Sequence, residues 1–400
     1  MEYEFMGYLR EDGTVGIRNH ILVLPSVVCS ARAANEIAFR TDVKTCYHQY
    51  GCGHVGPDFD FMRRSMSGLA RNPNVAAALI VGLGCEHVTA RALYKDVLAT
   101  GKPVKYLDIQ ESGGTRGTIE KGISIVEEFK SMVADKKREP FPLSKLQLGL
   151  ECGGSDTTSG LFANPALGVA SDKIVEAGGT SILPEFIEWF GAENTLAERF
   201  VDPKQAEEFK MAINGFRQVI KEMGLDFFLI APGNVKGGLT TIEEKAMGNI
   251  EKAGKAPIQG ALRYSEKPSR AGLWLMWEFG LDVESITGLS ASGCQICAFT
   301  TGQGTPTGSP IMPVIKITGN PHTYANQSCD IDIDVSKIIE DDSITIKSLG
   351  QDILNEIVAV ASGKETLAEK NDQGDIGFWR PPLIANADSE VMKYVKYYFS

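Results

Sequence analysis

The fold is decided by the stretch Leu148-Gly-Leu-Glu-Cys152-Gly-Gly-Ser-Asp156. It is typical of a buried strand that ends in a cysteine and is followed by two glycines and a polar turn. A helix is expected to start a short distance further on, near Pro165. A thiol close to helix amides ionises readily, and a thiolate binds metal ions. A small residue packed in a tight turn gives the same pattern, so this stretch alone leaves both interpretations of Cys152 open.

Three earlier segments repeat the arrangement of strand, cysteine and loop. One apolar run ends in Cys29, a second strand-like run leads into the loop of Cys52, and a third ends in Cys85. A helical pattern follows each loop, which predicts an α/β fold with parallel-sheet, Rossmann-like, three-layer domains. Ligands bind at the carboxyl ends of the strands in such sheets. We therefore expect Cys29, Cys52, Cys85 and Cys152 to meet there.

The charged, proline-bearing segment 134–142 predicts a boundary between two domains. Residues 1–140 are expected to form an N-terminal α/β domain with the first three cysteine loops. Residues 141–400 are expected to form a C-terminal α/β domain with the Glu-Cys-Gly-Gly-Ser-Asp loop and the Phe-Thr-Thr-Gly-Gln-Gly-Thr-Pro loop that begins at Phe299. A chain of 400 residues can supply a core for each.

The overall charge and the N-terminus exclude several classes of partner. A net charge of -11 argues against nucleic acid and against an anionic membrane surface. The longest apolar run, Val75 to Leu83, is too short to cross a bilayer. The first residues have no basic region followed by an apolar core, so no signal peptide is predicted. Eight cysteines without such a signal indicate a reducing compartment, and we expect a cytoplasmic protein.

Four thiols at strand ends predict a metal site. Iron, alone or in an iron–sulfur cluster, suits a thiolate-rich site in a cytoplasmic enzyme. Zinc is the competing metal, but it favours paired Cys-x-x-Cys knuckles, which these four cysteines lack. The pair Cys294 and Cys297 lies in a strand-like run, where a spacing of three places side chains on opposite faces. We predict no zinc or redox site there, and we expect Cys46 and Cys329 to be structural.

Residues able to transfer protons flank these cysteines. His48 can be a metal ligand or a general base, or a loop histidine without a chemical role, and the same alternatives apply to His54. Glu86 directly follows the third cysteine, and Asp156 closes the loop of the fourth. Each can move a proton or hold a metal, although capping the next helix is an equally ordinary role for Asp156. The predicted catalytic residues are His48, Glu86 and Asp156.

A glycine-rich loop near residue 302 is predicted to bind a carboxylate. Its backbone amides can hold an anion, and it has no Walker lysine, so a nucleotide is disfavoured. Lys316 is a further candidate partner for a carboxylate, although a single basic residue is more often structural or solvated. The predicted substrate-binding residues are Arg18, Asn19, Lys245, Thr301, Gly302 and Gly304.

Together these motifs resemble the altronate/galactarate dehydratase family of sugar-acid hydro-lyases, which includes the large subunit of sulfolactate sulfo-lyase. They extend from about residue 5 to residue 380 in the family's order. The matching motifs include Gly13-Thr-Val-Gly-Ile-Arg-Asn19, His48-Gln-Tyr-Gly-Cys52, Val81-Gly-Leu-Gly-Cys-Glu86, Glu151-Cys-Gly-Gly-Ser-Asp156, Gly237-Gly-Leu-Thr-Thr-Ile-Glu-Glu-Lys245 and Phe299-Thr-Thr-Gly-Gln-Gly-Thr-Pro306.

The resemblance implies an iron-dependent lyase that acts on a polyhydroxy carboxylate. It would remove the proton beside the carboxylate and expel the adjacent hydroxyl, which gives a 2-keto-3-deoxy acid. The implied cofactor is Fe²⁺, with Mn²⁺ able to replace it and an iron–sulfur cluster as the alternative. Iron held by three or all four of Cys29, Cys52, Cys85 and Cys152 would stabilise developing charge, while His48, Glu86 or Asp156 would shuttle protons.

The start of the chain bears on its expected partners. Fused family members carry a small β-rich domain of about a hundred residues before this point. We therefore expect a large catalytic subunit that works with a separate small β-rich subunit and forms a homo-oligomer. A split architecture also suits a sulfolactate sulfo-lyase that releases sulfite, but the glycine-rich loop more closely resembles that of the dehydratases. A non-catalytic subunit that binds metal or sugar acid is the alternative from another class.

Overall fold

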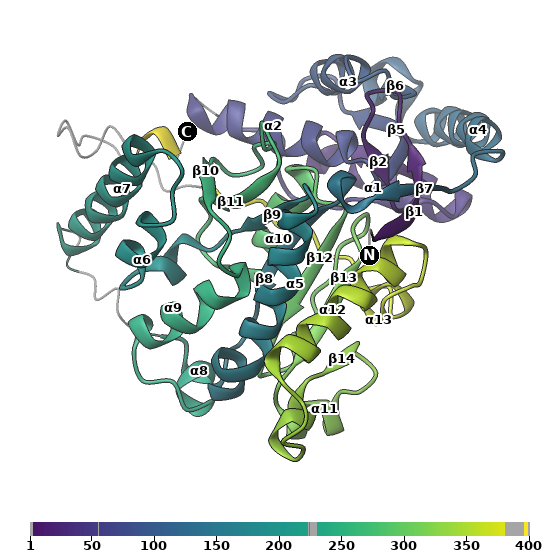
Figure 1. Ribbon diagram of the computed structural model, residues 1–400. Coiled ribbons are helices and arrows are strands. Elements are labelled where there is room, and N and C mark those ends of the chain that lie inside the picture. Colours follow the sequence, from purple (N-terminus) through teal and green to yellow (C-terminus); the bar gives the residue numbers. More distant parts are fainter. Residues whose placement is uncertain (1–2, 55, 223, 225–229, 381–395, 399–400) are drawn as a thin grey trace.

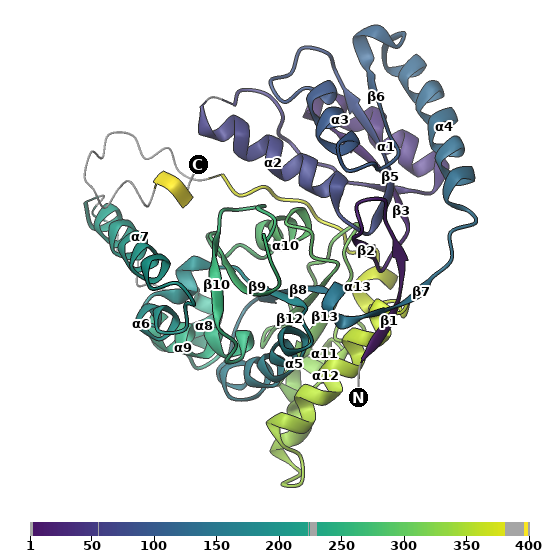
Figure 2. The same cartoon turned by 45° about the horizontal axis from the view of Figure 1, so that its top comes forward.

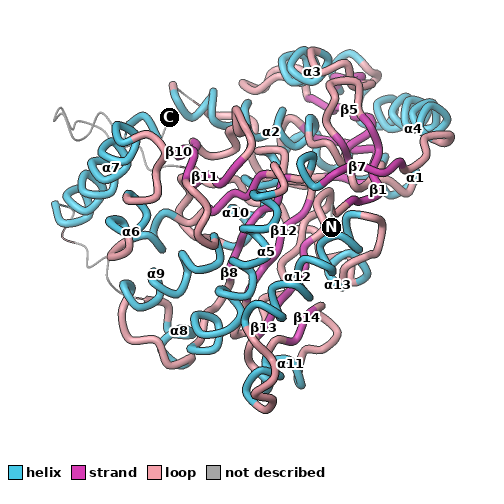
Figure 3. Tube along the Cα trace, in the orientation of Figure 1, coloured by secondary structure: helices cyan, strands magenta, loops and turns pink. Residues whose placement is uncertain are grey.

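Two parallel sheets form the framework of the protein (Figure 1). The computed structural model describes residues 3–54, 56–222, 224, 230–380 and 396–398. A four-stranded sheet lies in the first part of the chain and a seven-stranded sheet in the second. Figure 3 shows the strands of both sheets in magenta among the covering helices. The predicted α/β class with parallel, three-layer architecture is confirmed.

The first sheet is covered on both faces, which is why its central strand is apolar throughout. Its order is β4-β3-β5-β6, and every pair is parallel. All eight residues of β5 are buried. Ala77, Leu79 and Val81 pack under α1 and α4, while alternate residues of the same strand pack under α2 and α3. The elements are β3 (His20–Pro25), β4 (Lys44–Thr45), β5 (Val75–Gly82), β6 (Val104–Asp108), α1 (Val28–Thr41), α2 (Pro57–Arg71), α3 (Ala90–Leu98) and α4 (Gly114–Val133).

The second sheet has the order β10-β11-β9-β8-β12-β13-β14 and is also entirely parallel. Its strands are β8 (Gln147–Cys152), β9 (Thr180–Leu183), β10 (Ile258–Leu262), β11 (Gly272–Met276), β12 (Ile296–Thr300), β13 (Val314–Thr318) and β14 (Ile333–Asp334). β8 is central, and its neighbours β9 and β12 lie far from each other in sequence. Residues that follow these three strands are therefore brought to one edge of the sheet.

Helices cover both faces of the second sheet. On one face, α5 (Asn164–Glu176) packs against α12 (Ile346–Ala361) and beside α9 (Ile242–Ile250). On the other, α10 (Asp282–Ala291) packs on β8, where a Cβ at Gly149 would stand 2.8 Å from Leu289 Cδ1. The remaining helices are α6 (Glu193–Ala197), α7 (Pro203–Glu222), α8 (Pro232–Lys236), α11 (Pro321–Asn326) and α13 (Leu367–Lys370).

A small antiparallel sheet and the segment that contains Phe378 and Trp379 join the two halves. β1 (Glu4–Leu9) pairs with both β2 (Val15–Gly16) and β7 (Glu139–Pro142). α2 faces α10 along the boundary between the halves (Figure 2). Phe378 packs in the core of the first half and Trp379 in that of the second. Within the described residues, no helix has the length and apolar character needed to span a membrane.

Candidate functional site

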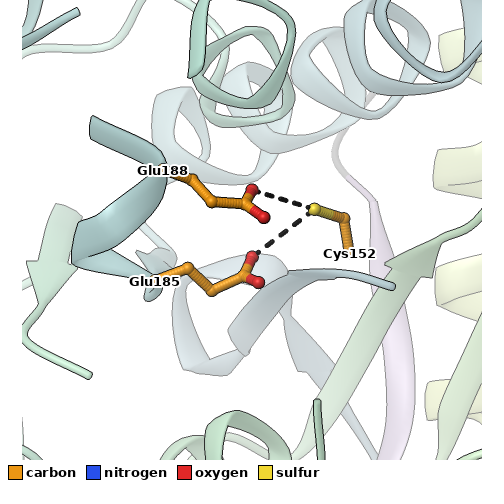
Figure 4. Close-up of side chains that lie close together, drawn as sticks. All are labelled: Cys152, Glu185 and Glu188. Carbon is orange, nitrogen blue, oxygen red and sulfur yellow. Dashed lines mark hydrogen bonds between the residues drawn. The ribbon is translucent and has the colours of Figure 1, made fainter. Parts of the chain in front are cut away.

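A buried cluster of one thiol and two carboxylates lies at the carboxyl end of β8 (Figure 4). The Cys152 Sγ lies 3.2 Å from Glu188 Oε2 and 3.6 Å from Glu185 Oε2, and its single hydrogen can be donated to one acceptor at a time. Among the residues that the structure describes, these three form the one set of potential metal donors whose ligand atoms all lie within 4.8 Å of one another. We call this set, together with the side chains that bond to it (Lys245, Lys252 and Asn249), the Cys152 cluster.

The strand order explains how the Cys152 cluster assembles. Cys152 is the last residue of β8, and Glu185 follows the adjacent parallel strand β9. Glu188 belongs to a 3₁₀ turn whose residues Phe186 and Trp189 are fully buried anchors. Glu185 has a left-handed backbone with φ 73°, which costs a residue other than glycine about 1–3 kcal/mol. The core thus forces a strained acid into this position.

Two lysines neutralise the two carboxylates. Lys245 on α9 lies 2.5 Å from Glu188, and Lys252, just after α9, lies 2.7 Å from Glu185. Lys252 is completely buried. α9 also supplies Asn249, whose Oδ1 accepts a hydrogen bond from the Cys152 thiol at 3.4 Å. The cluster is therefore a closed network of two ion pairs around a thiol.

Burial and the two ion pairs give the two carboxyls different properties. Burial, together with the neighbouring Glu188 carboxylate, raises the pKa of Glu185 to about 7. Burial also acts to raise the pKa of Glu188, but Lys245 and Lys252 outweigh it and hold that pKa below its ordinary value. Burial and both carboxylates raise the pKa of the Cys152 thiol well above normal. At neutral pH the Glu185 carboxyl is thus close to half protonated, while the Glu188 carboxylate stays ionised. Such a pair is suited to proton transfer.

Two further buried acids, Glu151 and Glu278, lie close enough to Glu185 for its charge to raise their pKa values. Neither carboxyl oxygen of Glu151 has a hydrogen-bond partner among the described residues. Burial and the Glu185 charge raise its pKa well above the ordinary value. Glu278 accepts hydrogen bonds from the backbone N–H groups of Gly280 and Leu281, and burial raises its pKa to about 8. Protonated carboxyls thus lie next to the Cys152 cluster.

The other three predicted thiols lie on separate loops at the carboxyl edge of the first sheet, and their sulfur atoms do not form a set within 4.8 Å of one another. Cys29 lies in the first turn of α1, Cys52 in the loop before α2 and Cys85 in the loop before α3, and all three are exposed. Backbone hydrogen bonds tie the three loops together, from Val28 N to Tyr50 O at 2.9 Å and from Val88 N to Gly51 O at 3.3 Å. The described hydrogen-bonding neighbours of Cys152 include none of these cysteines.

Both ring nitrogens of His48 are occupied by the backbone. Nε2 bonds to Pro25 O at 2.7 Å, and Nδ1 accepts from Tyr50 N at 3.2 Å. Burial lowers the pKa of His48 to about 4, so the ring is neutral at neutral pH. His54 accepts from Gly51 N, and its other nitrogen bonds to Asp58. In this arrangement both histidines hold the Cys52 loop in place.

Glu86 joins two of the cysteine loops. Its carboxylate accepts hydrogen bonds from Ser26 Oγ at 2.7 Å, Gly84 N at 2.7 Å and Ala90 N at 3.2 Å. Burial acts to raise the pKa of Glu86, but these hydrogen bonds outweigh it and lower the pKa. The carboxylate directly follows the exposed Cys85 in sequence and stays ionised. Because three hydrogen-bond donors already contact it, it can accept a proton or a metal only in competition with them.

Asp156 lies against the glycine-rich loop, as the strand order requires. It accepts from Ser159 N at 3.0 Å, which is the capping contact considered above, and from Asn320 Nδ2 at 2.6 Å. A Cβ at Gly302 would stand 2.3 Å from Asp156 Cγ. Thr301 Oγ1 accepts from Gly304 N at 2.9 Å, and Gly304 has φ +80°. The loop amides nearest to Thr301 are therefore turned inwards onto its own hydroxyl.

Arg18 and Asn19 lie in a structural junction. Arg18 forms a two-pronged ion pair with Glu369 at 2.7 and 2.8 Å and donates to Val360 O at 2.9 Å. Asn19 Oδ1 accepts from Arg10 at 2.8 Å. These contacts connect the start of the chain to α12 and α13, and their role in substrate binding stays a prediction.

Lys316 is buried beneath the glycine-rich loop. Its ammonium bonds to Thr307 O and lies 4.4 Å from the centroid of the Phe299 ring. Burial lowers its pKa to about 8. Lys245 is the predicted substrate-binding residue that lies in the Cys152 cluster itself.

Four residues of the cluster were not predicted from the sequence: Glu185, Glu188, Lys252 and Asn249. Glu185 could have been found, because it follows an apolar strand just as Cys152 does. Lys252 lies seven residues after Lys245, which is two helical turns and hence the same face. Nothing in the sequence marks Glu188 or Asn249, because their positions depend on the pairing of β8 with β9.

Two models of known protein domains match most of the chain. Residues 143–383 match the model of the D-galactarate/altronate dehydratase C-terminal domain. Residues 7–134 match the second domain of D-galactarate dehydratase/altronate hydrolase.

Curated relatives are similar over almost the whole chain. The (2R)-sulfolactate sulfo-lyase subunit beta of Chromohalobacter salexigens is 38% identical over 91% of this chain and 94% of its own length. The altronate dehydratase of Bacillus subtilis is 35% identical over 94% of this chain and 77% of its own length. The galactarate dehydratase (L-threo-forming) of Escherichia coli is 32% identical over 91% of this chain and 73% of its own length.

Proposed function

Because the chain belongs to the D-galactarate/altronate dehydratase family, we propose that it dehydrates a sugar acid of the altronate or galactarate type to a 2-keto-3-deoxy acid. Its relatives are named as dehydratases and lyases, and the chain is an enzyme of that class. The observation that carries the proposal is the Cys152 cluster, in which a carboxyl with a pKa of about 7 meets the buried Lys252 and the half-buried Lys245 at a strand end.

Dehydration asks for three things from the protein. A base must take the proton on the carbon beside the carboxylate, whose electron pair then forms the new C=C bond. The neighbouring C–O bond breaks, and the departing hydroxide takes up a proton to become water. The enol that remains becomes the keto acid. The carbanion-like charge that develops on the carboxylate must be stabilised by nearby cations.

The Cys152 cluster can supply these groups. Glu185 is the proposed base, because its pKa near 7 suits proton transfer at neutral pH. Lys245 and Lys252 are the proposed cations for the substrate carboxylate. Asp156 and the loop Thr301–Gly304 lie on the same edge of the sheet, where they would contact the hydroxyl groups.

Iron remains part of the proposal, and two donor sets fit it. Cys29, Cys52 and Cys85 offer three exposed thiols on hydrogen-bonded loops, which suits an iron–sulfur cluster. The Cys152 cluster offers sulfur and carboxylate oxygen together, which suits a single Fe²⁺ or Mn²⁺. We propose the three exposed thiols as the iron site, because burial and two carboxylates raise the pKa of the Cys152 thiol well above normal, whereas iron binds the thiolate form. The bound iron would act as a Lewis acid.

The second candidate is elimination of sulfite from sulfolactate. The similarity to the sulfo-lyase subunit beta, which extends over 94% of that protein, favours it. The proton removed is again beside a carboxylate, but a C–S bond breaks in place of the C–O bond. That relative is named as a subunit, which also supports our proposal that this chain needs a separate small β-rich subunit. Homo-oligomerisation and a cytoplasmic location stay predictions.

The test is a substrate panel under anaerobic conditions. The chain, purified with iron and supplied with the small subunit, would be incubated with altronate, galactarate and (2R)-sulfolactate. We expect a 2-keto-3-deoxy acid from one of the first two, and Glu185→Gln should abolish it. Sulfite and pyruvate from sulfolactate would establish the second candidate. No product from any of the three would contradict both.

A further inference from the structure

The proposed reaction needs a proton donor for the departing hydroxide, in addition to the base Glu185. The C–H bond and the C–O bond that break lie on neighbouring carbon atoms. The donor must therefore lie within a few ångström of the base, at the carboxyl edge of the second sheet. The segment 277–281, which connects β11 to α10, reaches this edge.

Hydrogen bonds fix this segment beside Glu185. The carboxylate of Glu278 accepts from Gly280 N at 2.6 Å and from Leu281 N at 3.2 Å. The backbone oxygen of Glu278 accepts from Phe186 N at 2.8 Å, directly after the base. A Cβ at Gly280 would lie 3.9 Å from Glu185 Oε1, and Gly280 has φ 97°, a conformation that favours glycine. The backbone of the segment therefore passes close to the proposed base.

Asp282 follows this segment and is the first residue of α10. Two residues of chain span at most about 7 Å, so Asp282 lies close to the contact between Gly280 and Glu185. It is half-buried. An acid is thus placed near the base without being sealed inside the core.

The face of the sheet that α10 covers carries a row of three fully buried side chains. Phe299 of β12 is in register with Glu151 of β8 and with Lys316 of β13, and such partners point to the same side of a sheet. That side is the one covered by α10, because a Cβ at Gly149, two residues before Glu151, would contact Leu289. The thiol of the next residue of β8 points to the other face.

Charged groups on both faces interact with Asp282. On one face, the charge of Glu188 acts to raise its pKa and that of Lys245 acts to lower it. On the other, Asp282 is among the charges that act on the pKa values of Glu151 and Lys316, on which burial has the largest effect. A side chain within reach of both faces lies at the edge of the sheet, where we propose that the substrate binds.

The glycine-rich loop also reaches Asp282. The Thr305 hydroxyl lies beside the Asp282 carboxyl and acts to lower its pKa, against the larger effect of burial, which raises it. The same hydroxyl lies against Gly153, where a Cβ would collide with it. Gly153 directly follows Cys152. Asp282 is therefore placed where the loops after β8 and β12 meet the segment before α10.

We propose that Asp282 is the acid that protonates the departing hydroxide, an assignment that rests on the proposed dehydration. Glu185 takes the proton from the carbon beside the carboxylate, and the electron pair of that C–H bond forms the C=C bond. The C–O bond breaks, and its oxygen takes the proton of the Asp282 carboxyl, so that water leaves and Asp282 becomes a carboxylate. One proton passing from Glu185 to Asp282 through solvent then restores both groups.

The surroundings of Asp282 suit this role. Burial raises its pKa, the Glu188 charge adds to this effect, and the negative charge of a bound sugar acid would raise the pKa further. The carboxyl therefore keeps its proton to higher pH than an ordinary aspartic acid. Lys245 acts in the opposite direction and stabilises the carboxylate that forms. A positioned general acid contributes about 10²–10⁴-fold to the rate.

The test uses the full chain under anaerobic conditions with the small subunit supplied. The substrates are altronate and galactarate, and the analogue of each in which fluorine replaces the departing hydroxyl group. Fluoride is a weak base and leaves without a proton. We expect Asp282→Asn to lower kcat for the sugar acid by at least about a hundredfold, with KM within about threefold, and to slow fluoride release by less than about threefold. Asp282→Glu, which keeps the acid, should restore part of the rate.

Two other variants serve as controls. Glu284→Gln changes a second acid in the first turn of α10, which lies beside Gly377, and it should keep both rates. Glu185→Gln removes the base and should abolish both. Asp282→Asn replaces a carboxyl whose charge is disfavoured by burial, so the variant should fold, with a Tm within about 3 °C of the wild type.

A loss of rate with the sugar acid that is absent with its fluoro analogue supports the proposal. Equal losses with both substrates would make Asp282 a positioning residue and overturn it. An unchanged rate with the sugar acid would also overturn it. Wild-type protein that releases neither water nor fluoride would overturn the proposed dehydration itself, and this assignment with it.

Discussion

Lys252→Met tests the account of the Cys152 cluster most directly. The lysine is fully buried and lies 2.7 Å from Glu185. Removing one partner of a buried pair costs about 3–5 kcal/mol, because the other charge is left without compensation. Protonation of Glu185 removes the unpaired charge at low pH, because the pKa of this carboxyl is already about 7 and rises further without the lysine. We therefore expect a loss of about 3–5 kcal/mol at pH 8.

The pH dependence follows from the same reasoning. The pKa of Glu185 is higher in the folded protein than in the unfolded chain. Its contribution to the free energy of unfolding is therefore complete below the unfolded-state pKa and is lost as the pH rises through the folded-state pKa. In the wild type this loss ends near pH 7, whereas in Lys252→Met it continues above pH 8. The difference in unfolding free energy should therefore grow by about 1.4 kcal/mol from pH 7 to pH 8.

Urea unfolding at pH 7 and pH 8, followed by circular dichroism, would measure this effect. The matched control is Lys255→Met, an exposed lysine three residues further on with no ion pair in the described residues, and it should change stability by less than about 0.5 kcal/mol. Adding Glu185→Gln to Lys252→Met removes the carboxyl that has lost its lysine, and this should restore part of the lost unfolding free energy. A pH-independent cost below about 1 kcal/mol, similar to that of the control, would refute the ion-pair account.

Three other predictions can be measured with the same protein. Glu278 has a pKa of about 8, so its contribution to stability is lost as pH rises from about 4.5 to 8. In Glu278→Gln the unfolding free energy should therefore fall less steeply with pH, by up to about 1.4 kcal/mol per pH unit. Unfolding free energies of the variant and the wild type that change in parallel with pH would contradict this. Cys85→Ser should at least halve the iron bound per chain in anaerobic metal analysis, whereas the exposed Cys329→Ser should not; equal iron in both would move the metal away from the first sheet. Arg18→Gln should cost about 3 kcal/mol in urea unfolding and leave KM within about twofold; a large rise in KM with unchanged stability would assign Arg18 to the substrate instead.

Much of the fold follows from local pattern. Apolar runs such as Val75–Leu83 and the helices between them are enough to indicate parallel sheets. The rule that ligands lie at strand ends also located Cys152 and its loop. Local pattern was sufficient here because strands and helices are defined by neighbours in sequence.

Pairings between distant segments could not be predicted in the same way. Whether Cys152 meets other thiols or carboxylates depends on β9 lying next to β8, and strand order is not encoded by periodicity. The pair between Arg18 and Glu369 joins residues 351 positions apart. Local pattern marks Arg18 as a possible partner for an anion, but it gives no sign of the pairing with Glu369 that the structure shows.

The segment around Phe378 has a consequence for how the protein is made. Its ring packs edge-on against His48 at 5.4 Å and Tyr50 at 5.5 Å, so the N-terminal core is completed by a residue 330 positions later in the chain. At about 5–20 residues per second, a ribosome needs on the order of 15–65 s to reach it. During that time the Cys52 loop lacks its apolar cover. Folding of this edge of the first sheet should therefore be completed late, and nascent chains should depend on chaperones until Phe378 has emerged from the ribosome.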